Sequence, residues 1–247
     1  MCLLIVLRGL QPGHPVVAGA NRDERTDRPF SPPGLFVGRT RRILSPRDRL
    51  AGGTWIGVND AGVFAAITNL AGSPPPAGAP SRGHLVHLAL DAGSPTEGLA
   101  TVERVAREVP HGGFQLAVCD GRQTFVMVHR AGRIDVVAWP DPVLVMTNEH
   151  APGRLQLPLL APAMDAALSI EHRLDLVAAA LRDRGESSGH AVLKKGTGYG
   201  TVSSSLVAVH GSDPQRLVWR YAAGAPDEVG YRNYGNLGRR LLPDDET

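Results

Sequence analysis

The N-terminal part of the sequence contains two short apolar runs separated by a turn. The first run spans residues 2–7 and the second spans residues 16–20, with glycines and prolines between them. Short runs rich in Val, Ile and Leu on either side of a turn predict two paired strands rather than a helix. Neither run alternates polar with apolar residues, so both faces of each strand are expected to be covered, as in a central strand of a layered sheet.

The second run leads into four polar residues, Asn21, Arg22, Asp23 and Glu24. Alternate side chains of a strand share a face, so Asn21 and Asp23 are expected on one face and Arg22 and Glu24 on the other. In a paired hairpin, Asn21 and Asp23 lie near the start of the first strand. There a carboxylate could orient an amine or thiol, and an amide could bind a reacting carbonyl. The alternative interpretation is a polar strand end with surface ion pairs.

The remaining pattern predicts strands and helices in alternating groups. Strands are expected at 43–45, 52–58 and 63–68, in a meander of three or four strands at 114–119, 124–129, 134–138 and 143–147, and at 201–210 and 217–222. Helices are expected at 81–90 and 95–108, capped by Ser81 and Ser94, and in two pieces between 154 and 184, with Gly185 as a C-cap. The proline-rich segment 25–38 is expected to be irregular, and 71–80 to be a loop near Asn69. This order favours two antiparallel sheets between helix layers and excludes a doubly wound parallel sheet.

Composition narrows the class of protein further. The 247 residues, 43% hydrophobic and 20% charged, are expected to form a single globular domain over 1–247. A formal net charge of +2 without a long basic run argues against a nucleic-acid partner. Two cysteines do not make a disulfide framework, and Cys119 is expected to be a buried structural thiol. The opening apolar run is too short for a signal or membrane-spanning segment, so we expect a soluble, cytoplasmic protein.

Cys2 stands at the head of the first predicted strand, with only Met1 before it. An initiator methionine is normally removed when the next side chain is small, and Cys2 would then carry both a thiol and a free α-amine. An α-amine with a pKa of about 7.7–8 is partly neutral near pH 7, so it can act as a base toward its own side chain. This is the chemistry of an N-terminal nucleophile.

Four further polar residues end apolar strands and are expected to converge on Cys2, because ligand sites gather at strand ends. These residues are Asn21, Asp23, Asn69 and Asn148. For amide hydrolysis, Asp23 would orient the α-amine of Cys2, and Asn69 or Asn148 would donate to the oxyanion. Further candidate pocket residues are Arg22, Glu24, Thr68, Ser203 and Ser204. Each asparagine taken alone is more often a strand-end cap or a turn residue, and only their joint position favours a shared site.

Several motifs occur in order along the chain. They are MC at 1–2, ANRDE at 20–24, RP at 28–29, SPRD at 45–48, AGGTWIGVNDAG at 51–62, ITN at 67–69, SRG at 81–83 and YGTVSSSL at 199–206. In these motifs the sequence resembles the NRDE family, also called the transport and Golgi organisation protein 2 family. The resemblance implies an α+β, four-layer αββα sandwich similar to N-terminal nucleophile hydrolases, with Cys2 in the position of the nucleophile.

A second, more local resemblance is to amide hydrolases of the choloylglycine type. The stretch at 147–149 resembles their TN-N motif, and Asn21-x-Asp23 resembles their Asn-x-Asp. Those enzymes carry an arginine just before the asparagine, where this chain has Ala20. They carry another near a serine-rich strand, where this chain has Leu206.

Two functional hypotheses follow from these residues. The first is a hydrolase, without a cofactor, that uses Cys2 to cleave a small amide or N-acyl compound. The second is a non-catalytic binding or trafficking protein that uses the same pocket for haem or acyl-CoA, two ligands that the family resemblance suggests. Cys2 and Asp23 favour the first hypothesis, and the two missing arginines favour the second. Both imply a small-molecule partner.

Overall fold

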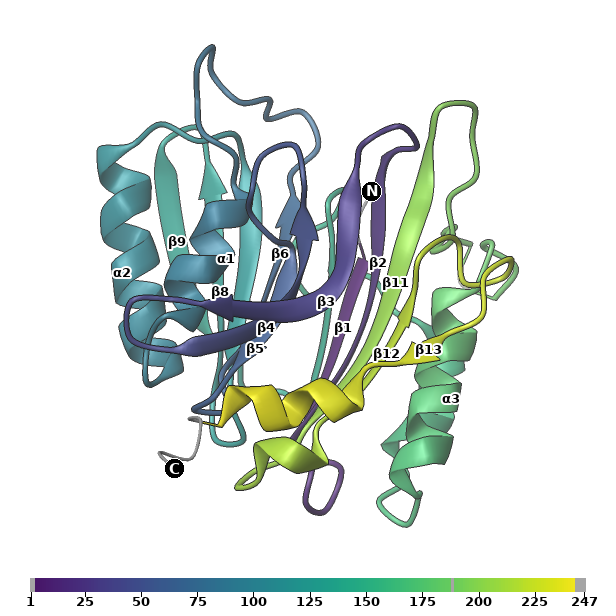
Figure 1. Cartoon of the computed structure of the whole chain (residues 1–247). Helices are drawn as coiled ribbons and strands as arrows, with labels where there is room; N and C mark the ends of the chain where they lie inside the picture. The colour runs from purple at the N-terminus through teal and green to yellow at the C-terminus, as the bar shows by residue number, and fades with distance from the viewer. Residues whose placement is uncertain (1–2, 188, 243–247) are drawn as a thin grey trace.

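The computed structural model describes residues 3–187 and 189–242, and in it two antiparallel sheets are stacked between helices. Helices α1 (Gly83–Leu90) and α2 (Pro95–Glu108) cover the outer face of one sheet, and α3 (Ile170–Leu181) covers the outer face of the other (Figure 1). The expected four-layer αββα sandwich is therefore confirmed. Short 3-10 helices η1 (Pro158–Met164), η2 (Pro214–Arg216) and η3 (Gly235–Leu241) complete the described chain. None of the helices in this part of the chain combines the length and apolar character needed to cross a membrane.

Each sheet is built largely from neighbouring segments of the chain. Sheet A has the order β10 (Val143–Thr147), β1 (Leu3–Arg8), β2 (Val16–Arg25), β11 (Tyr199–Val209), β12 (Val218–Ala222) and β13 (Arg232–Asn233). Sheet B has the order β3 (Phe30–Val37), β4 (Arg42–Asp48), β5 (Ile56–Asn59), β6 (Phe64–Asn69), β7 (Phe114–Cys119), β8 (Thr124–Arg130) and β9 (Arg133–Ala138). Sheet B is a meander, whereas sheet A joins the two ends of the described chain.

The predicted N-terminal hairpin forms the middle of sheet A. Leu3 pairs with Asn21 across the hairpin, and Thr147 pairs with Leu3 from the other side. Strand β2 continues through the polar residues to Arg25, five residues further than its apolar run. It can do so because β11 pairs with it over its whole length, from Val16 to Arg25, and satisfies its backbone groups.

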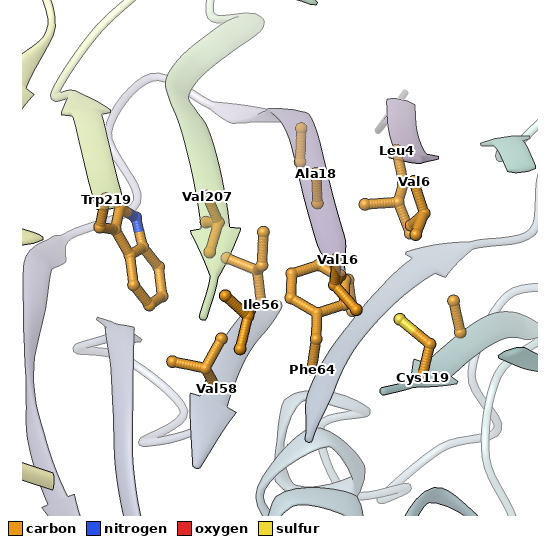
Figure 2. Packing of buried hydrophobic residues seen from close by; sticks show 14 of the residues in the cluster. Leu4, Val6, Val16, Ala18, Ile56, Val58, Phe64, Cys119, Val207 and Trp219 are labelled. Carbon is orange, nitrogen blue, oxygen red and sulfur yellow. The ribbon is translucent and has the colours of Figure 1, made fainter. Parts of the chain in front are cut away.

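Both faces of β1 and β2 are buried, as their continuous apolar runs predicted. Leu4 and Val6 point into the core between the two sheets, where they pack with residues such as Phe64 of sheet B (Figure 2). Leu3 and Ile5 point the other way, into the core beneath α3. A third core joins sheet B to α1 and α2. Cys119 is fully buried between the sheets, which confirms the predicted structural thiol, and its burial raises its pKa.

The prediction of an irregular segment over 25–38 was wrong, because β3 occupies Phe30–Val37. This strand lies at the edge of sheet B, where a proline need not donate to a neighbouring strand. Its pairing with β4 shifts register between Ser31 and Gly34, where the two prolines lie. A strand with a bulge and no apolar alternation has the composition of a loop, which explains the error.

The fourth strand of the predicted meander belongs to the other sheet. After β9 the chain passes through Pro140 and Pro142, and β10 then pairs with β1 rather than with β9. This crossing carries the residues that follow Thr147 to the end of sheet A at which β1 begins. The position of Asn148 beside the start of β1 therefore depends on this change of sheet.

The helix ends agree only in part with the sequence. Ser94 caps α2 as predicted, and its hydroxyl accepts a hydrogen bond from Glu97 N at 3.3 Å. Ser81 does not cap α1, whose N-cap is Arg82 without a side-chain hydrogen bond. Gly185 is not the C-cap of α3, which ends at Leu181 and has Arg182 as its C-cap. The first helical piece predicted after residue 154 is the 3-10 helix η1, since its prolines disrupt α-helical hydrogen bonding.

We expect Gly19→Ala to destabilise the fold because α3 packs directly on this position of β2. A Cβ at residue 19 would lie 2.3 Å from Val177 Cγ1 and 3.1 Å from Leu181 Cδ1. Valine is stiff about χ1, so the helix must shift, at a cost of about 1–3 kcal/mol in unfolding free energy. Urea denaturation measures this cost. The matched control is Gly34→Ala in β3, where no atom lies within 4 Å of the new Cβ. Equal stability of the two variants would contradict the close packing of α3.

Candidate active site

The start of β1 lies at the centre of a row of paired residues that crosses sheet A. The row runs Thr147, Leu3, Asn21 and Ser204, one residue from each of four adjacent strands. Cys2 lies outside the described residues, as does Met1, but Cys2 is joined covalently to Leu3. Adjacent Cα atoms are about 3.8 Å apart, so the described row begins one residue along the chain from Cys2.

Asp23 is the buried carboxylate of the site. Its side chain is 3% exposed, and Thr201 Oγ1, on the paired strand β11, donates a hydrogen bond to Asp23 Oδ1 at 2.6 Å. Lys194 N donates to Thr201 Oγ1 at 3.0 Å and holds this hydroxyl in place. Burial raises the pKa of Asp23 to about 6, against the opposing effects of the Thr201 hydrogen bond and the Lys194 charge. Asp23 can therefore exchange a proton close to neutral pH, as a general acid or base requires.

Asn21 shares the face of Asp23, as the strand alternation predicted, but it is turned toward the helix layer. Its side-chain amide donates to Leu181 O at 2.8 Å and to Val192 O at 3.4 Å. Both amide hydrogens are thus used to join the end of α3 and the following loop to β2. Among the described residues, the buried Oδ1 atom of Asn21 has no hydrogen-bond partner. In this arrangement Asn21 supports the position of the neighbouring Asp23.

Arg22 points to the opposite face, toward sheet B. Its guanidinium lies 4.4 Å from the ring centroid of Trp55 and donates a 3.4 Å hydrogen bond to Asp48 Oδ2. Glu24 Oε2 lies 3.7 Å from Arg22 Nη2, and Arg28 Nε donates to Asp48 Oδ2 at 2.7 Å. These contacts form a largely buried ionic network with a cation–π contact. The expected separation of Asn21 and Asp23 from Arg22 and Glu24 is therefore found. Arg22 and its partner Asp48 are buried, whereas Glu24 and Arg28 are partly exposed.

A small cavity of about 110 Å³ lies where this network meets sheet B. Its lining includes Asp23, Arg22 and Glu24 from β2, and Asn69 from the end of β6. The structure thus brings Asp23 and Asn69 to the same cavity, although they belong to different sheets. Its other walls are Arg28, Asp48, Thr54, Trp55, Ile67, Ser81, Arg82 and Gly83.

Asn148 lies beside this region but does not line the cavity. It follows Thr147, the partner of Leu3, and its backbone oxygen accepts a hydrogen bond from Ala71 N at 2.8 Å. That bond joins Asn148 to the chain two residues after Asn69. Its Oδ1 atom is buried and has no hydrogen-bond partner within the described ranges. Thr68 is also buried, on the strand that ends at Asn69, and is not part of the cavity lining.

The two candidate serines are buried in sheet A and do not line the cavity. Ser203 pairs with Arg22, and Ser204 pairs with Asn21. Ser204 Oγ contacts Ala20 O at 3.2 Å and Tyr231 Oη at 2.8 Å, so it supports the sheet. The two positions at which the choloylglycine-type arginines are missing are apolar core positions in this protein. Ala20 packs between the sheets and Leu206 packs beneath α3.

Sequence reasoning missed Thr201, which makes the closest hydrogen bond to the Asp23 carboxylate among the described contacts. The YGTVSSSL motif pointed to this strand, but the choice between Thr201 and the serines depends on register. A register shift between Thr201 and Ser203 places Thr201 opposite Asp23. Trp55 packs against the cores on both faces of sheet B and also lies on the cavity wall, beneath the Arg22 guanidinium.

A larger hollow of about 500 Å³ lies along the free edge of sheet A. Its walls are mostly apolar and include Trp139, Val143, Val145, Leu157 and Met164. None of the described site residues predicted from the sequence lines this hollow. It is therefore separate from the cavity at Asp23, although both adjoin the strands that flank β1.

The fold is that of the N-terminal nucleophile hydrolases. The conjugated bile acid hydrolase of Clostridium perfringens, as a cysteine-to-alanine mutant, superposes with a TM-score of 0.53 at 10% identity over 95% of this chain and 92% of that one. An arginine-to-leucine variant of the same hydrolase superposes with a TM-score of 0.54 at 12% identity over the whole of both chains. The N-acylethanolamine-hydrolyzing acid amidase orthologue of Caenorhabditis elegans superposes with a TM-score of 0.56 at 12% identity, over 84% of this chain and 92% of that one. At these identities the likeness establishes the fold alone.

The family is established by the sequence itself. Residues 1–159 match the family described as Transport and Golgi organisation 2, and the chain belongs to this family. No sequence among the curated proteins gives a significant match to the chain. The matched region includes β1, β2 and Asn148, whereas Thr201 lies on a strand beyond it.

We expect the burial of Asp23 to make stability depend on pH. The pKa of Asp23 is about 6 in the folded state and about 4 in the unfolded state. As the pH rises from 4 to 6, Asp23 therefore loses its proton in the unfolded state first. The contribution of Asp23 is most favourable below about pH 4, and it is lost as the pH rises toward 6. The total change is on the order of 2–3 kcal/mol in unfolding free energy.

Urea denaturation of the wild type and of Asp23→Asn between pH 4 and 7.5 tests this expectation. The variant should gain stability relative to the wild type as the pH rises from 4 to 6. Asp141→Asn, which changes an exposed carboxylate, is the control and should follow the wild type. Parallel pH profiles for the wild type and Asp23→Asn would contradict a raised pKa.

Proposed function

We propose that this protein hydrolyses a small amide or N-acyl compound with Cys2 as the nucleophile. The observation that carries the proposal is the placement of Asp23, a buried carboxyl group whose pKa is raised toward neutrality, near the start of β1. The two strands of the hairpin are antiparallel, with Leu3 opposite Asn21. Moving from Leu3 toward the N-terminus along β1 therefore corresponds to moving from Asn21 to Asp23 along β2. An N-terminal nucleophile needs a group in this place to orient its own amine.

The reaction takes place in two steps. The Cys2 thiolate attacks the amide carbonyl carbon, and a C–S bond forms while the carbonyl π electrons move to oxygen. The oxyanion collapses, the C–N bond breaks, and the leaving amine takes a proton from the α-ammonium group of Cys2. Water then adds to the thioester, releases the carboxylic acid and restores the thiol. Asp23 would hold the α-amine throughout, supported by Thr201.

The oxyanion would be bound by side-chain amides at the ends of β6 and β10. Asn69 lines the cavity with Asp23, and Asn148 follows the strand that pairs with β1. The hydrogen bond between Ala71 N and Asn148 O holds the two strand ends together. Fixed donors of this kind are effective because they need no reorganisation when charge develops in the transition state.

A second candidate function is the non-catalytic binding of haem or acyl-CoA at the same site. It is favoured by Ala20 and Leu206, which fill apolar core positions where choloylglycine-type hydrolases carry arginines. The cavity at Asp23 measures about 110 Å³, whereas sites for ligands of drug size measure roughly 300–1,000 Å³. Either ligand would therefore require the cavity to open. Titration of the protein with haem, followed by absorbance, and with acyl-CoA, followed by calorimetry, tests this candidate.

We expect Cys2→Ala to abolish the hydrolysis of a chromogenic amide. Wild type and variant are compared on N-acyl anilides of increasing acyl length, with release of the aniline as the readout. Loss of the nucleophile should lower kcat by at least about 10³-fold. The control is Cys119→Ala, because this second thiol is fully buried between the sheets and should leave turnover unchanged in the folded protein. Turnover that survives in Cys2→Ala would overturn the proposal, as would a wild type that hydrolyses none of the series.

Kinetic measurements can distinguish donors to the oxyanion from residues that only bind the substrate. On a substrate identified in that series, Asn69→Ala or Asn148→Ala should lower kcat by about 10²–10³-fold with a smaller change in KM, because a donor to the oxyanion acts mainly in the transition state. Asn236→Ala, in the exposed part of η3, is the control and should have no effect. A change confined to KM in both asparagine variants would show that neither residue binds the oxyanion.

A further inference from the structure

Three side chains with metal-binding groups meet beside the candidate active site. Glu149 and His150 follow directly after Asn148, and His190 comes from the loop between α3 and β11. One ligand atom from each side chain lies within 4.8 Å of the other two. The cluster therefore joins two segments that are some 40 residues apart in the sequence, which local sequence spacing does not reveal.

His150 is held in place by groups that are not themselves metal ligands. Thr147 Oγ1 lies 3.1 Å from Nδ1 of the imidazole, and the Thr147 hydroxyl also accepts a hydrogen bond from His150 N at 3.1 Å. Gln115 Nε2, from sheet B, donates to the backbone oxygen of His150 at 3.1 Å. A hydrogen bond to one ring nitrogen is the usual way to orient a histidine so that the other nitrogen binds a metal.

The dimensions and charge of the cluster suit a transition-metal ion. Bonds of about 2.0–2.1 Å from zinc place its tetrahedral ligand atoms roughly 3.4 Å apart, so the three groups need to approach by at most about 1.4 Å. The exposed side chain of Glu149 can make this movement. Two imidazoles and one carboxylate form a known catalytic zinc set with an open fourth position, and they carry one negative charge toward a divalent cation.

A lysine competes with a cation for this site. Lys194 Nζ lies 3.8 Å from Glu149 Oε1, where it neutralises the carboxylate. A bound divalent ion would replace this ion pair, and the flexible side chain of Lys194 can turn away, since it is partly exposed. The backbone N–H of Lys194 would stay bonded to Thr201, the partner of Asp23. The cluster thus adjoins the active-site carboxylate without including it.

We propose that Glu149, His150 and His190 bind a divalent first-row transition-metal ion, with zinc as the reference ion. The proposal does not depend on amide hydrolysis, because it rests on the placement of the three side chains and the support of His150. It assigns a role to the two residues that follow Asn148 and to the loop before β11, none of which has a part in the nucleophilic mechanism described above.

The test is a zinc titration of the tag-free, full-length protein by calorimetry, with bound zinc counted by elemental analysis after dialysis. One equivalent should bind. Glu149→Gln, His150→Ala and His190→Ala should each weaken binding by at least about tenfold, as the loss of a ligand requires. Glu149 is exposed, so its variant is the one in which folding is least affected. His172→Ala, an exposed histidine on α3, is the matched control and should bind like the wild type.

A variant that is expected to bind zinc more tightly than the wild type makes the test more specific. Lys194→Met removes the competing ammonium group while keeping an unbranched side chain, so it should tighten zinc binding by roughly tenfold. A merely adventitious surface histidine would not show this gain. Cobalt as a second probe should bind without a strong sulfur-to-metal charge-transfer band, because the proposed ligands are nitrogen and oxygen.

The proposal is overturned if no zinc binds, if His150→Ala and His190→Ala bind as tightly as the wild type, or if cobalt shows a thiolate band. None of these results depends on a substrate. They are therefore distinct from the failure of Cys2→Ala to affect turnover, which would overturn the hydrolase proposal alone.

Discussion

The pairing of β1 between β10 and β2 is the constraint on which the site depends. This strand lies inside sheet A, and its neighbours bring Thr147 and Asn21 to either side of Leu3. All the polar groups of the candidate site are placed by reference to this row, because a strand has no freedom to slide once both faces are buried. A slip of one residue would exchange the faces of β1, so that side chains shaped for the core between the sheets would have to pack beneath α3, and the reverse. The hydrophobic cores thus fix the position at which the described chain enters the site.

This arrangement destabilises the charged form of Asp23. A carboxylate that is 3% exposed loses most of its hydration, and the side-chain hydrogen bond from Thr201 compensates only in part, so its pKa rises to about 6. Asn21 contributes by holding α3 and the loop after it against β2. Destabilised charged groups of this kind are frequent at functional sites, where a folded protein keeps them for their chemistry.

Much of the fold could be predicted because most strands carry local signals. The apolar runs of β1 and β2 and the Asn-Asp-Ala-Gly turn before β6 identified hairpins from neighbouring residues alone. Strand β3 was missed because an edge strand tolerates the prolines that elsewhere mark a loop. The change of sheet at β10 was missed because the choice of partner strand depends on contacts between residues distant in sequence.

The sequence predicted which strands carry the candidate site and which face each residue of β2 occupies, but not the contacts that these side chains make. The alternation of β2 correctly separated Asn21 and Asp23 from Arg22 and Glu24. The bulge in β11, which selects Thr201 over Ser203 as the partner of Asp23, has no signature in a run of small polar residues. The direction of Asn21 toward α3 likewise depends on where the helix ends.

The measurement that tests the central claim most directly is the intact mass of the protein before and after brief alkylation under native conditions. The account predicts that Met1 is absent, that a single label enters rapidly at Cys2, and that Cys119, buried between the sheets with a raised pKa, stays unmodified. Retention of Met1, or labelling of Cys2 no faster than that of Cys119, would contradict an N-terminal nucleophile beside Asp23.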